Sequence, residues 1–102
     1  MNQPSTPISD AVRVRIDKLF PPSIRPEVVA LLETRCGTSL PGFSKATPGE
    51  CDRIRFAVLK LSCGNFVRLL AAVADANIDW RDTLMAAGFG YDAKAHESWF
   101  PA

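Results

Sequence analysis

The sequence predicts an all-α protein: a small orthogonal bundle of five or six short helices around a central helix near residues 48–62. Two observations lead to this prediction. Apolar residues recur at the three- and four-residue spacing of a helix through most of the chain. Capping residues, glycines and prolines separate these segments by connections that are mostly short, which suits abrupt turns between helices.

The central helix has clear start and stop signals. Thr47 is followed by Pro48, and Glu50 lies three residues after Thr47. This pattern is a capping box with proline at the first helical position. Gly64 is expected to take the left-handed conformation that closes the helix.

Apolar side chains occupy two faces of this central helix. Phe56 and Leu59 lie roughly opposite the face that carries Val58 and Leu61. A helix that is apolar on two sides is normally covered on both, so we expect the other helices to pack around it. Arg55 is expected to carry its charge outward along its aliphatic stem. Replacing Val58 or Leu61 by alanine should cost about 2–4 kcal/mol of stability.

The segments before the central helix are predicted as follows. Residues 1–8 form a flexible N-terminal tail, because they are mainly polar residues and proline. A helix begins at Ser9 or Asp10 and ends before Pro21, although its alternation of valine and arginine also fits a strand. A second helix ends near Gly37.

Three helices are predicted after the central one, and Asn65, Asp79 and Asp92 are placed to cap them. The first of the three is rich in alanine, at residues 71, 72, 74 and 76, and this thin side would let another helix approach closely. Gly88 ends the second. Residues 9–102 are therefore predicted to form a single helical domain.

Composition narrows the function classes. The chain has 102 residues, 47% of them hydrophobic, and a net charge of +1, which are values typical of a globular domain. No signal peptide and no apolar run long enough for a membrane span is present, so we expect a bacterial cytoplasmic protein without membrane contact. Cys36, Cys51 and Cys63 have no CxxC spacing and are expected to be buried thiols in a reducing compartment.

Catalysis has weak support in the sequence. His96 is the only histidine, and Asp92 lies one helical turn before it, a spacing that can orient an imidazole. Ser98 faces elsewhere, and no nucleophile motif or phosphate-binding glycine loop is present. The cysteines and His96 lack the local spacing of a zinc site. We therefore expect no catalysis, cofactor or metal, and an enzyme centred on His96 is the last alternative.

Nucleic-acid binding is an intermediate alternative. Residues 65–88 read as helix, short turn, helix, but the second of these helices carries Asp79 and Asp82 in its first turn, where phosphates would be repelled. A weak nucleic-acid-associated regulator would instead need one basic face made by two helices. The four residues in question are Arg13, Arg15, Arg53 and Arg55.

Protein binding is the leading hypothesis, with an unknown protein partner or a second copy of the chain. Aromatic residues are concentrated near the C-terminus, and tryptophan and tyrosine are favoured at interaction hot spots. Trp99 and Phe100 either dock on a partner or fold back to seal the bundle. Leu40 and Phe43 lie in a long connection that they are expected to pin onto the core. The candidate partner-binding surface comprises Leu40, Phe43, Tyr91, His96, Trp99 and Phe100.

Overall fold

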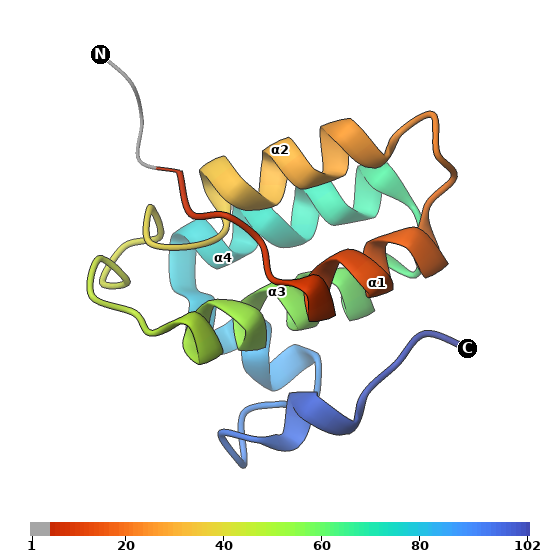
Figure 1. Cartoon of the computed structure of the whole chain (residues 1–102). Coiled ribbons are helices and arrows are strands. Elements are labelled where there is room, and N and C mark those ends of the chain that lie inside the picture. The colour runs from red at the N-terminus through yellow and green to blue at the C-terminus, as the bar shows by residue number, and fades with distance from the viewer. Residues whose placement is uncertain (1–4) are drawn as a thin grey trace.

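The protein is all-helical over residues 5–102, the part of the chain that the computed structural model describes. Within that range the helices are α1 (Asp10–Leu19), α2 (Arg25–Arg35), α3 (Pro48–Ser62), α4 (Phe66–Ala86) and a short 3₁₀ helix, η1 (Ala95–Ser98) (Figure 1). The predicted all-α class is confirmed. The predicted count of five or six helices is not, because two of the expected helices are joined in α4. The strand alternative for the first segment is wrong, because that segment is α1.

The central position of α3 follows from its two apolar faces. The Thr47 hydroxyl accepts from the Glu50 amide at 3.2 Å, and the Glu50 carboxylate accepts from the Thr47 amide at 3.0 Å, so the capping box forms as predicted. Phe56, Leu59 and Val58 are all buried. Helices α1, α4 and η1 all contact α3, which confirms that this helix is covered on two sides (Figure 1).

The turn from α3 to α4 depends on two left-handed residues. Cys63 has φ 51° and Gly64 has φ 78°, so the left-handed conformation begins one residue before the predicted glycine. A Cβ atom at Gly64 would lie 2.9 Å from the carbonyl oxygen of Leu19 at the end of α1. Glycine is therefore required both by the backbone conformation and by the close approach of α1. The Asn65 side chain then caps α4 by accepting from the Arg68 amide.

Helix α4 is interrupted at Asp79. The backbone of this residue is extended, with φ −154° and ψ 101°, and its carboxylate accepts from the Arg81 amide at 3.0 Å. Asp79 therefore behaves as the cap that the sequence predicted, but only a single residue separates the two helical parts. Before the break, the Asn77 side chain donates to the carbonyl of Arg35 at 3.0 Å and so ties α4 to the end of α2.

Arg55 departs most from expectation, since only 1% of it is exposed. Its guanidinium donates to four backbone carbonyls: Nε to Cys36 at 2.8 Å, Nη1 to Pro7 at 3.0 Å, and Nη2 to Thr6 at 2.6 Å and to Leu32 at 3.3 Å. Two of these carbonyls belong to the C-terminal end of α2, which carries partial negative charge. The prediction of an outward charge is wrong, because these acceptors replace the water that the guanidinium loses.

The segment before α1 is held against the domain. The Thr6 amide donates to the Glu33 carbonyl at 3.0 Å, and the Ile8 amide donates to the Glu33 carboxylate at 2.9 Å. The sequence predicted a flexible tail over residues 1–8, of which residues 1–4 lie outside the described part of the chain. These contacts, with those of Arg55, place Thr6 to Ile8 on the folded domain despite that prediction.

Candidate functional site

Three of the six candidate surface residues belong to the core. Leu40, Phe43 and His96 are all buried. The ring of Phe43 lies 4.9 Å from the ring of Trp80, so the long loop is anchored on α4 as expected. These three residues therefore offer almost no side-chain surface to a partner.

The C-terminal segment folds back over α3. The Trp99 ring is partly buried 6.1 Å from the ring of Phe56. Arg15 of α1 donates to the Trp99 carbonyl from Nε at 3.1 Å and from Nη2 at 2.9 Å. Trp99 thus adopts the sealing arrangement. Tyr91 and Phe100 remain exposed, so the six candidate residues do not come together as one surface.

His96 packs among aromatic rings. Its ring lies 5.2 Å from the ring of Phe56 and 6.3 Å from the ring of Phe89. Burial lowers the pKa of His96, and its Nδ1 has no hydrogen-bond partner. Asp92 does not orient the imidazole, because its carboxylate accepts from the Lys94 amide at 2.8 Å. This environment is that of a core side chain.

The four arginines considered for nucleic-acid binding do not form one open face. Arg55 is buried, while Arg53 and Arg15 donate to carbonyls of the C-terminal segment at 2.6 and 2.9 Å. Lys60 donates to the carbonyl of Ala87, the C-cap residue of α4, at 2.8 Å. These cations satisfy backbone acceptors of neighbouring elements, and of the four arginines only Arg13 is exposed and makes no side-chain hydrogen bond within the described residues.

The cysteines differ in exposure. Cys36 and Cys51 are buried as expected, whereas Cys63 is exposed because it lies in the left-handed turn after α3. Burial raises the pKa of the Cys36 thiol to about 12 and also raises the pKa of the Cys51 thiol. Over residues 5–102, no three His, Cys, Asp or Glu side chains are grouped so that they could hold a metal ion.

An exposed apolar face runs along the first part of α4. Val67 is 73% exposed and Ile78 is 82% exposed, and the alanines between them on this face are also exposed. The spacing is i, i+4, i+7 and i+11, which is one side of a helix. The opposite side carries the buried Leu69 and Val73. We call this face the α4 outer stripe: Val67, Ala71, Ala74 and Ile78.

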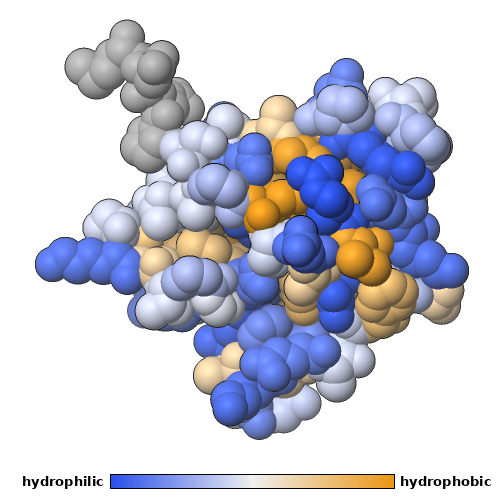
Figure 2. All heavy atoms as spheres, viewed as in Figure 1, coloured by the Kyte–Doolittle hydropathy of each residue, from blue (hydrophilic) through white to orange (hydrophobic). Residues whose placement is uncertain are grey.

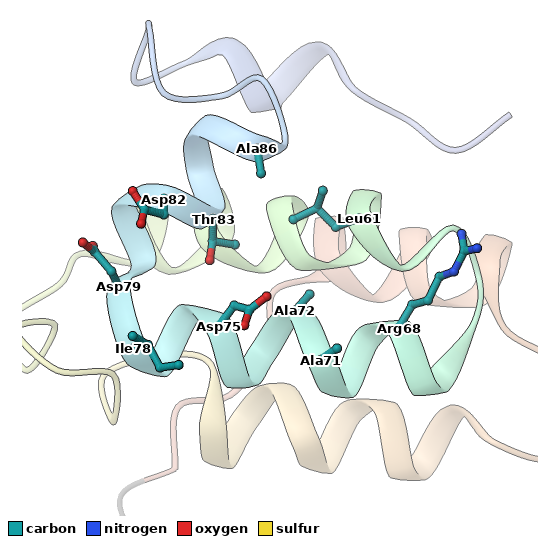
Figure 3. Close-up of a pocket in the computed structure, with 10 residues that line it drawn as sticks. All are labelled: Leu61, Arg68, Ala71, Ala72, Asp75, Ile78, Asp79, Asp82, Thr83 and Ala86. Atoms are coloured by element: carbon teal, nitrogen blue, oxygen red, sulfur yellow. The ribbon is translucent and has the colours of Figure 1, made fainter.

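A groove of about 530 Å³ borders the α4 outer stripe. It lies between Leu61 of α3 and the two parts of α4, which diverge at the break (Figure 3). Its charged side chains are Arg68 near the start of α4 and Asp75, Asp79 and Asp82 further along. The stripe therefore has a polar border on this side, which is the usual arrangement of an interaction surface.

The face formed by α1 and α2 mixes apolar and charged side chains. Figure 2 shows its hydrophobic atoms interrupted by strongly hydrophilic side chains. A groove of about 620 Å³ between these helices is lined by Arg13, Asp17, Arg25 and Glu33 as well as by apolar residues. Arg25 and Asp17 form an ion pair at 3.4 Å across it. Three of these charges already have partners within the chain, since Glu33 accepts from the Ile8 amide, and this favours a solvated surface.

Comparisons with protein-family models, curated proteins and solved structures give no match to this chain. No helix within residues 5–102 is long and apolar enough to cross a membrane. Function must therefore be inferred from the surface of the molecule. The sequence pointed to a thin side of this helix at alanines 71, 72, 74 and 76, but only Ala71 and Ala74 are exposed, whereas Ala72 and Ala76 are buried.

Proposed function

We propose that this protein is a non-catalytic binding module that recognises a protein surface through the α4 outer stripe. The observation that supports this proposal is the exposure of two large aliphatic side chains, Val67 and Ile78, on the side of α4 that faces away from the core. Helices that dock onto partners present apolar anchors at this same spacing. Leaving such a face in water is unfavourable, and covering it is the simplest reason for its pattern.

Two features favour binding of protein over the other hypotheses. Of the four arginines considered for a nucleic-acid surface, Arg15, Arg53 and Arg55 donate to backbone carbonyls of neighbouring elements, so the four do not present one continuous basic face to phosphates. His96 is buried among aromatic rings and lines none of the grooves described above, so an enzyme centred on it would lack access to substrate.

The test compares capture of partners from native cells by two matched variants. Ile78 and Tyr91 are each 82% exposed, but only Ile78 belongs to the stripe. We expect Ile78→Glu to lose the proteins, including tagged copies of the chain itself, that the wild type captures. Tyr91→Glu should retain them. The proposal is wrong if both variants capture the same set as the wild type, or if the wild type captures nothing and remains monomeric.

A further inference from the structure

We infer that the occupant of the α4 outer stripe is the same stripe of a second copy, packed antiparallel about a two-fold axis. This inference rests on the proposed function and specifies its partner. The axis passes midway along the stripe, so that Ala71 lies against Ala74 of the second copy. The register that makes this contact also sets Val67 against Ile78 of the second copy.

The sizes of the side chains fit a crossed pair of helices. Packed helices cross at an angle, so their axes are closest at one point and diverge on either side of it. The small side chains of Ala71 and Ala74 lie at the crossing point and allow close approach. The larger Val67 and Ile78 lie at the two ends, where the gap is wider and must be filled. The pattern is symmetric about the centre, as a two-fold interface requires.

The charges are complementary in the same register. Arg68 and Asp75 both line the groove, on one flank of the stripe (Figure 3). A two-fold axis perpendicular to the antiparallel helices keeps that flank of both copies on the same side. In this register Arg68 is offset by two residues from the position directly opposite Asp75 of the second copy. At about 1.5 Å per residue, this offset is about 3 Å along the helix axis. The two-fold symmetry therefore generates two equivalent Arg68–Asp75 ion pairs in the dimer.

Both charges are free to make that pair. Within the described residues, neither the Arg68 side chain nor the Asp75 side chain forms an ion pair or a hydrogen bond. A parallel pairing would instead place the two charged flanks on opposite sides of the interface and leave Arg68 and Asp75 unpaired. The antiparallel arrangement is therefore the one that satisfies the apolar and the charged side chains together.

The expected dimer is weak. The stripe spans 11 residue steps, or roughly 16 Å of helix. A single helix pair of this length falls at the small end of protein interfaces, below about 1,200 Å² in total. We expect a dissociation constant on the order of 100 µM, which sedimentation equilibrium between about 10 µM and about 1 mM detects.

The decisive experiment exchanges the charges one chain at a time. Arg68→Asp sets two carboxylates together at each contact, and Asp75→Arg sets two guanidinium groups together, so each variant alone should associate about tenfold more weakly than the wild type. An equimolar mixture of the two variants should restore association, because both contacts of the mixed pair again have opposite charges. Arg13→Asp makes the same charge change on α1 and should leave association unchanged.

Each outcome bears on the inference. A mixture that associates no better than the separate variants overturns it, and so does a wild type that remains monomeric to about 1 mM. If the wild type is monomeric but Ile78→Glu still loses a captured protein, the stripe binds a different partner and the proposed function stands without a second copy. Val67→Glu is an independent check: the side chain is 73% exposed, so the fold should tolerate the change while association is lost.

Discussion

Replacing Arg55 by methionine tests whether one buried cation holds three parts of the fold together. The guanidinium joins α3 to the end of α2 and to the segment before α1 through four hydrogen bonds. A hydrogen bond that involves a charged group contributes about 1.5–3 kcal/mol, and the cost of burying the guanidinium offsets several kcal/mol of the total. We expect Arg55→Met to lower the free energy of unfolding by about 3–5 kcal/mol, since the carbonyls of Thr6, Pro7 and Cys36 lose their donor.

Urea unfolding followed by circular dichroism measures this loss. At about 4–8 °C per kcal/mol for a domain of this size, a loss of about 3–5 kcal/mol should lower the melting temperature by roughly 12–40 °C. Arg13→Met, on an exposed side chain, should change stability by less than about 0.5 kcal/mol and serves as the control. A loss below about 1 kcal/mol for Arg55→Met would refute the reasoning, because the bonds would then only balance the cost of burial.

A second measurement locates the effect. The amides of Thr6 and Ile8 donate to Glu33, and these bonds hold the segment whose carbonyls Arg55 also binds. Hydrogen exchange at these two amides should speed up in Arg55→Met more than exchange in the middle of α3. Uniform acceleration along the chain would indicate general destabilisation rather than release of this segment.

Three further predictions concern single side chains. Burial lowers the pKa of His96 below its usual 6.5, so the unfolded chain takes up a proton at a higher pH than the folded one. The free energy of unfolding should therefore decline as the pH falls through about 6.5. Urea titrations at about pH 7.5 and about pH 5.5 measure this decline, which should be smaller for His96→Phe than for the wild type. In the native protein, a thiol reagent should modify Cys63 rapidly and the two buried cysteines only on unfolding, since the pKa of Cys36 is raised to about 12. Val58→Ala should lower the free energy of unfolding measured in urea by about 2–3 kcal/mol, and Leu61→Ala by only about 1 kcal/mol, because Leu61 is half-buried and borders the groove. Equal losses for the two variants would contradict this expectation.

The parts of the fold that depend on local chemistry were predictable. The capping box at Thr47 uses residues three positions apart, and both of its hydrogen bonds form. The cap at Asp79 was also located correctly, although no local signal indicates that the two helical parts follow each other without a loop. Local signals mark where the backbone changes direction but not how many residues the change requires.

The parts that depend on distant contacts were not predictable. Arg55 is predicted to carry its charge outward along its aliphatic stem, whereas its acceptors come from positions 19 to 49 residues away. The burial of half of the candidate surface residues has the same cause. Leu40 and His96 are buried by contacts with distant parts of the chain, and the exposed face of α4 became identifiable only once the covered side of that helix was known.

The position of Arg55 also limits how far the chain can be shortened. Thr6 and Pro7 supply two of its four acceptors, so a version that begins at Ser9 would leave the guanidinium half-satisfied inside the protein. Such a version would contain every α-helix and still be less stable than the full chain. The smallest unit suitable for crystallisation or fusion should therefore retain the residues before α1.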